Sequence, residues 1–165
     1  KHSRRPFTIN YKTAKYTHLP ARDAEINGDL KRSSIHANCS FIENWKNTED
    51  YIYWDIDVLE DGINNIELYY TLEKESIGTE IALEFENQIL KKTIDNFHDP
   101  SLVGFNEDKI KRIESYTKDF KRINIGKMSF KKGISRLKLK TTKKKGKKSI
   151  DFRLLILKNE NEKNS

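Results

Sequence analysis

The stretch Tyr51–Val58, with the sequence YIYWDIDV, decides the fold. Its apolar side chains occupy every second position: Ile52, Trp54, Ile56 and Val58. The more polar positions between them are Tyr51, Tyr53, Asp55 and Asp57. Successive side chains of a β-strand point to opposite faces of the sheet, so this alternation predicts a strand with one buried and one solvated face.

The same alternation recurs on both sides of this stretch. We expect about nine short strands separated by turns, including 24–26, 40–45, 51–58, 66–72, 81–85, 89–94, 123–130, 137–140 and 150–157. Many short strands with turns between them and no internal repeat are typical of an all-β sandwich or jelly roll. The turn Glu60-Asp61-Gly62 predicts a hairpin of strands 51–58 and 66–72. In the last strand we expect Ile150, Phe152, Leu154 and Ile156 on one face.

Length and composition agree with a single two-layer domain. The chain has 165 residues, of which 35% are hydrophobic and 35% charged, so its core must be thin. Its single cysteine, Cys39, excludes an internal disulfide. No run approaches the roughly 18 apolar residues of a membrane span, and we expect no membrane partner.

The net charge of +7 is unevenly distributed. Between Asp119 and Asp151 there are 13 basic residues and no acidic residue, whereas 19 basic residues elsewhere face all 25 acidic ones. Such a strip attracts sulfate- or phosphate-bearing polyanions, and its densest part is the tip formed by Lys143, Lys144, Lys145, Lys147 and Lys148. The alternative is structural: Lys131, Lys132, Lys138 and Lys140 would be outward positions of edge strands, where lysine blocks edge pairing.

The longest segment without a strand pattern is His98–Phe120, and it is the candidate site. Long loops inside compact domains are usually functional or disordered. This one offers both hydrogen-bond donors and acceptors, as sugar recognition requires, in His98, Asp99, Arg112, Glu114, Tyr116 and Lys118. Alternatively, these groups pair with one another to hold the loop in one shape, and residues 108–113 could form a short helix.

The sequence gives little support for catalysis. Cys39 has no evident activating partner, the four histidines lack zinc-ligand spacing, and no phosphate-binding glycine loop is present. We therefore expect no catalytic residue, no metal and no cofactor. Nucleic-acid binding is disfavoured because the basic strip lacks interleaved aromatic residues.

The ordered series of strings along the chain resembles a family. The segment HLPARDAEINGDLKRSSIHANCSFIENW (His18–Trp45), followed by YWDIDV, IELYYT, HDP, RIESYTKDF and DFRLLIL, is similar to the C-terminal, non-catalytic domain of bacterial secreted sulfatases of the arylsulfatase and N-acetylgalactosamine-6-sulfatase type. The resemblance covers about residues 16–158.

This resemblance implies a galactose-binding-like β-sandwich over residues 18–158. Residues 1–17 would be the linker or arm from an upstream catalytic domain, and residues 159–165 a frayed tail. It also implies a secreted or periplasmic parent enzyme that hydrolyses sulfate esters on glycans. The sulfatase nucleophile motif C/S-x-P-x-R is missing, since Cys39 is followed by SFIE, so the domain would support the catalytic domain or help to bind a sulfated glycan. The alternative is a stand-alone carbohydrate-binding module for anionic glycans.

Overall fold

A computed structural model of the chain describes residues 6–10, 15–33, 41–99 and 120–160. Within them the secondary structure is almost entirely strand: β1 Phe7–Ile9, β2 Tyr16–Pro20, β3 Glu25–Asn27, β4 Lys31–Arg32, β5 Ile42–Glu43, β6 Tyr51–Val58, β7 Gly62–Thr71, β8 Glu80–Phe85, β9 Gln88–Thr93, β10 Lys121–Phe130, β11 Gly133–Lys143 and β12 Asp151–Asn159. Two 3-10 turns, η1 Ala21–Asp23 and η3 Lys74–Ser76, interrupt them. The described chain has no helix with the length and apolarity that crossing a bilayer requires.

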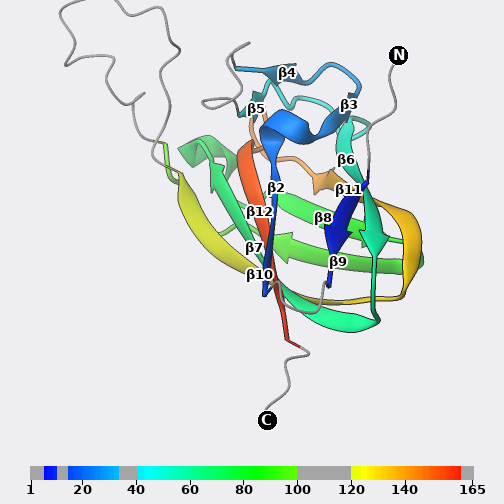
Figure 1. Cartoon of the computed structure of the whole chain (residues 1–165). Helices are drawn as coiled ribbons and strands as arrows, with labels where there is room; N and C mark the ends of the chain where they lie inside the picture. The colour runs from blue at the N-terminus through cyan, green and yellow to red at the C-terminus, as the bar shows by residue number, and fades with distance from the viewer. Residues whose placement is uncertain (1–5, 11–14, 34–40, 100–119, 161–165) are drawn as a thin grey trace, which may run out of the picture.

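The strands form two six-stranded sheets that pack face to face (Figure 1). The first sheet has the order β1-β6-β11-β8-β9. β3 also pairs with β6, along the first half of that strand, whereas β1 pairs with its second half. The second has the order β10-β7-β12-β5-β4, with β2 paired to the other part of β12. The predicted all-β sandwich of the jelly-roll type is therefore confirmed, with additional short strands at the margins of the nine expected.

The core between the sheets consists of the apolar positions that alternation predicts. Ile52, Trp54, Ile56 and Val58 of β6 are at most 1% exposed. The Trp54 ring meets the Phe152 ring edge to face, with centroids 5.7 Å apart, and Phe85 meets Phe130 in the same way at 4.7 Å. Each such pair joins strands of opposite sheets, so burial of large rings holds the two layers together.

The predicted hairpin of β6 and β7 is wrong. β6 pairs with β1, β3 and β11, whereas β7 pairs with β10 and β12 in the other sheet. The turn after Val58 carries the chain from one sheet to the other, so the two apolar faces pack against each other instead of lying side by side. β11 is also a central strand, between β6 and β8, so Lys138 and Lys140 do not protect an edge.

The face predicted for the last strand is wrong in its second half. A register shift between Phe152 and Leu154 inserts Arg153 as an extra residue. Such a β-bulge moves the following side chains to the opposite faces. The core therefore receives Leu155 and Leu157, while Leu154 and Ile156 face outward.

Part of the arm expected over residues 1–17 belongs to the sandwich. β1 pairs in parallel with Ile56–Val58 of β6, and Ile9 is fully buried. The Asn10 amide donates to the Glu60 carbonyl oxygen at 2.8 Å and accepts from the buried Asn64 amide at 2.8 Å. These contacts attach residues 7–10 to the crossing between the two sheets.

Gly126→Ala is expected to destabilise the fold by about 1–3 kcal/mol, because Gly126 has φ of 124° and an added Cβ would lie 2.9 Å from Leu90 Cδ1. Urea unfolding measures this. Gly133→Ala is the matched control, since Gly133 has φ of 131° and no atom within 4 Å of the added Cβ. Equal losses in both variants would show that the contact with Leu90 contributes nothing.

Candidate functional site

Polar and aromatic side chains lie among a few apolar ones on the outer face of the sheet that contains β10, β7, β12 and β2, whose strands Figure 1 labels. The pairing registers arrange its side chains in three rows across the strands. The rows, each in the strand order β10, β7, β12 and β2, are Arg122, Tyr69, Leu154 and Pro20; Asn124, Glu67, Ile156 and His18; and Lys127, Asn65, Lys158 and Tyr16. Neighbours within a row are the closest cross-strand pairs of a sheet.

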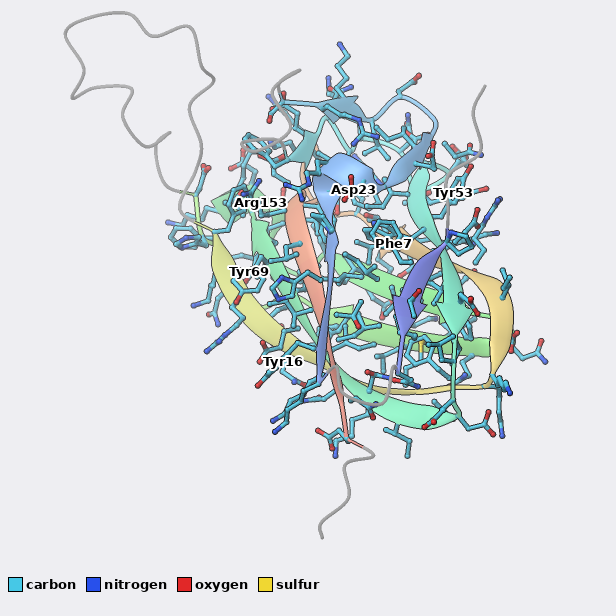
Figure 2. All side chains as sticks on the ribbon, in the orientation of Figure 1. Phe7, Tyr16, Asp23, Tyr53, Tyr69 and Arg153 are labelled. Carbon is cyan, nitrogen blue, oxygen red and sulfur yellow. The ribbon has the colours of Figure 1, made fainter. Side chains whose placement is uncertain are left out.

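This surface is hollowed into a groove of about 350 Å³, lined by Tyr16, His18, Asn65, Glu67, Tyr69, Arg122, Ile156 and Lys158. Two tyrosines stand in its first and third rows: Tyr69 lies in the first row on β7, and Tyr16, which is 54% exposed, lies in the third row on β2. Figure 2 shows both tyrosines on the left side of the molecule and Tyr53 on the right. Two strand spacings across the sheet and four residues along a strand separate the Cα atoms of these tyrosines by about 16 Å.

The groove combines groups that donate hydrogen bonds with groups that accept them. Arg122 lies 4.0 Å from Glu67, which is too far for a strong ion pair, and both side chains remain partly exposed. Asn124 donates to the Asn65 side-chain oxygen at 2.9 Å, which leaves the Asn65 amide group as a donor. Among the residues that the structure describes, no partner is found for the Tyr69 hydroxyl or the His18 imidazole. The groove can therefore hydrogen-bond to a ligand.

The outer face of the other sheet also carries tyrosines and cations, but these satisfy one another. The Arg136 guanidinium donates to Asp55 at 2.9 Å and lies 4.0 Å from the centroid of the Tyr53 ring. The Tyr51 ring has the Lys138 and Lys140 ammonium groups at 5.0 and 5.8 Å. Lys140 also pairs with Glu84 at 3.0 Å. This face is consequently a weaker candidate for a ligand.

The structure describes two of the six predicted loop residues. His98 forms a bridge to Leu72 just beyond β7: its N–H donates to the Leu72 carbonyl at 2.9 Å, and its carbonyl accepts the Leu72 N–H at 2.8 Å. Asp99 follows and is exposed. Arg112, Glu114, Tyr116 and Lys118, like the helix considered for 108–113, lie outside the described residues.

The described flanks of that loop lie beside one end of the groove. His98 is bonded next to the end of β7, and at the other flank Lys121 pairs with Tyr70. Arg122 and Tyr69, the first row of the groove, follow directly. Phe120 packs edge to face on Phe41, with centroids 5.3 Å apart. The described flanks of the predicted loop therefore neighbour the groove, although prediction and structure select different residues.

The predicted lysine tip lies at the same end of the sandwich and is held there by hydrogen bonds. The Lys145 N–H donates to Thr79 Oγ1 at 3.2 Å, and Ser76 Oγ donates to the Lys148 carbonyl at 2.7 Å. Lys148 turns inward and pairs with the buried Asp151 at 3.1 Å. Within the described part of the chain, no group of three or more His, Cys, Asp or Glu could hold a metal ion.

Two titratable groups at this end have raised pKa values. Burial, aided by Asp95, raises the pKa of the Tyr70 phenol above its ordinary value of 10.0. Burial alone would lower the pKa of Lys148, but the charge and hydrogen bond of Asp151, with Glu73 and Glu43, raise it above 10.5. In both cases the folded state retains a proton that the unfolded state releases at lower pH.

The free energy of unfolding is therefore expected to be constant up to about pH 10 and to fall as the pH rises further. A group whose pKa is higher in the folded than in the unfolded state stabilises the fold while it is protonated, and this contribution is lost when it deprotonates. Urea unfolding between pH 9 and pH 11 measures this. In Tyr70→Phe one of the two groups is absent, so the decline should be shallower. A decline of the same slope would exclude a contribution from Tyr70.

Sequence reasoning missed the groove residues, although a signal for them exists. Tyr69 and Glu67 are the outward positions of a strand whose inward positions, Leu68 and Tyr70, are buried in the core. The same alternation that identifies core residues therefore identifies candidate surface residues. What the sequence lacks is the register that places Tyr16 and Arg122 beside them.

The fold is a jelly-roll β-sandwich of the kind found in carbohydrate-binding modules. No protein-family model matches the chain, and no curated protein matches it. Among solved structures, it is similar to the C-terminal CBM6 of the laminarinase LamC from Zobellia galactanivorans, with 9% identity and a TM-score of 0.59 over 87% of this chain and 98% of that one.

Larger proteins contain the same fold. A Podospora anserina GH26-CBM35 β-(1,4)-mannanase matches with 8% identity and a TM-score of 0.61 over 90% of this chain, and the mosquito-larvicidal toxin Cry4Aa of Bacillus thuringiensis with 12% identity and a TM-score of 0.62 over 89%. The chain spans only 28% of the mannanase and 24% of the toxin. Because an enzyme and a toxin share the fold, the function must be argued from the site.

Proposed function

We propose that this chain is a carbohydrate-binding domain that holds a glycan in the groove between Tyr69 and Tyr16. The groove itself carries the proposal, because it combines two outward tyrosine rings with partly exposed hydrogen-bond donors and acceptors. The similarity to modules named for carbohydrate binding supports the same conclusion.

The chemistry of the groove matches that of a sugar chain. Each sugar hydroxyl both donates and accepts a hydrogen bond, and the C–H faces of the ring pack on aromatic side chains. Arg122 and the Asn65 amide supply donors, and the Glu67 carboxylate supplies an acceptor. The Cα atoms of the two tyrosines are about 16 Å apart by strand geometry, more than one sugar ring spans, which favours several units of a chain over a single sugar.

A narrower proposal places this domain in a sulfatase. The support is the resemblance of His18–Trp45 and the later strings to the accessory domain of secreted sulfatases. The parent enzyme would be secreted or periplasmic, and the catalytic domain would lie upstream in the same polypeptide. The loop residues His98, Asp99, Arg112, Glu114, Tyr116 and Lys118 would then contact either the glycan or that domain. An upstream reading frame carrying C/S-x-P-x-R tests this, and a frame encoding an unrelated domain would exclude it.

A glycan array followed by titration calorimetry tests carbohydrate binding. We expect selective binding of one class of oligosaccharide, with affinity that rises with chain length until both tyrosines are covered. Binding of monosaccharides as tightly as of longer chains would contradict the extended groove. If no glycan binds at millimolar concentration, the proposal fails and a docking role for this face becomes the better account.

A further inference from the structure

The structure divides the basic strip of residues 120–150 into paired and unpaired cations. Four of its side chains have acidic partners at 2.9–3.1 Å, and the pairs are Lys127 with Glu160, Arg136 with Asp55, Lys140 with Glu84, and Lys148 with Asp151. Lys138 lies over the Tyr51 ring. Among the described residues, three exposed lysines at the end of β11 and in the loop that follows it have no partner: Lys143, Lys145 and Lys147.

These three lysines alternate along a segment whose backbone is hydrogen-bonded to neighbouring residues. Besides the bonds to Thr79 and Ser76, the Ser149 N–H donates to the Trp45 carbonyl at 2.7 Å. Lys144 is used internally, because its ammonium donates to the carbonyls of Gly146 and Lys147 at 3.1 and 3.3 Å. Gly146 has φ of 72°, and an added Cβ would lie 2.8 Å from the Glu75 carbonyl oxygen. A loop ordered in this way loses little entropy when it binds.

The neighbouring turn η3 moderates the charge but does not cancel it. Glu73 and Glu75 flank Lys74, whose ammonium lies 6.0 Å from the centroid of the exposed Phe97 ring. The Glu73 carboxylate also helps to raise the pKa of Lys148. The tip itself, residues 143–148, contains five lysines and no acidic or aromatic residue.

We propose that Lys143, Lys145 and Lys147 form a second binding site, separate from the groove, for the sulfate groups of a sulfated polysaccharide. Lysine ammonium groups act as point charges that suit sulfate esters without bidentate geometry. Nucleic acid is the other polyanion, but the tip has no ring on which a base could stack. The preference for polysaccharide rests on the proposed function, whereas the anion site itself does not.

Binding of dextran sulfate, measured by calorimetry over a range of salt concentrations, tests the site. We expect the logarithm of the association constant to fall linearly with the logarithm of salt concentration. In the triple variant Lys143→Gln, Lys145→Gln and Lys147→Gln, the slope should be smaller by about two to three, because each phosphate-like contact contributes about 0.7–0.9. Unsulfated dextran should not compete.

The matched control changes the same charge elsewhere, with Lys91→Gln, Lys131→Gln and Lys132→Gln, all three exposed. It should keep the wild-type slope, and thermal melts of both triple variants should match the wild type. An equal loss of slope in the control would overturn the proposal in favour of diffuse attraction. The proposal would also be overturned if dextran sulfate does not bind. It would equally fail if single-stranded DNA binds as tightly as dextran sulfate and this binding depends on the tip. Tyr69→Ala separates the two proposals, because it acts on the groove and leaves all three lysines in place.

Discussion

Tyr69→Ala is expected to weaken glycan binding about ten- to a hundred-fold. Tyr69 is the outward ring in the first row of the groove, beside Arg122, and no partner is found for its hydroxyl among the described residues. Loss of one aromatic stacking platform costs about 1–3 kcal/mol of binding free energy in single-stranded nucleic acid complexes, where flat rings stack in a comparable way. Calorimetry with the oligosaccharide selected by the glycan array measures the change.

Two further variants make this result specific. Tyr16→Ala should weaken binding of long oligosaccharides and leave short ones unaffected, because Tyr16 stands at the far corner of the groove. Tyr53→Ala is the control: it removes a tyrosine from the other sheet, where Arg136 covers the ring at 4.0 Å. If Tyr53→Ala reduces affinity as much as Tyr69→Ala does, the ligand lies on the opposite face and the groove is not the site.

The sequence predicts which face of a strand is buried better than it predicts which strands lie side by side. The alternation in Tyr51–Val58 correctly assigns Trp54 and Ile56 to the core, because a period of two follows from the strand itself. Which strand lies beside which depends on contacts between distant residues. The turn after Val58 is compatible with a hairpin and with a crossing between sheets, and only packing of the two apolar faces decides between them.

The site illustrates the same limit. Sequence reasoning selects His98–Phe120 because polar residues are dense there in one continuous segment. The groove instead gathers Tyr16, Tyr69 and Arg122 from strands that are far apart along the chain. A one-residue bulge at Arg153 also decides that Ile156 faces the groove and Leu155 the core. Such a bulge leaves no local pattern from which it could be predicted.

The lysine tip depends on an ion pair that is buried beneath it. Asp151 begins β12 and is 1% exposed, and its carboxylate accepts from the Lys148 ammonium at 3.1 Å and from Thr71 Oγ1 at 3.4 Å. The side chain of Lys148 is 22% exposed. A buried carboxylate that loses its cation retains the cost of desolvation without the attraction that offsets it.

Lys148→Met is accordingly expected to destabilise the fold by about 3–5 kcal/mol. Urea unfolding near pH 7 measures the loss. Lys147→Met is the matched control, because Lys147 is the exposed neighbour of Lys148 in the same loop and should change stability by less than about 0.5 kcal/mol.

The double variant Lys148→Met with Asp151→Leu removes both charges and should recover most of the loss, because buried ion pairs are often replaced by apolar side chains without net cost. If Lys148→Met is instead as stable as Lys147→Met, other contacts of Asp151 suffice and the pair does not hold the tip. The position of Lys143 and Lys145 would then depend on strand pairing of β11 and on the hydrogen bonds to Thr79, Ser76 and Trp45. The charged pair thus links the stability of the sandwich to the geometry of the proposed anion site.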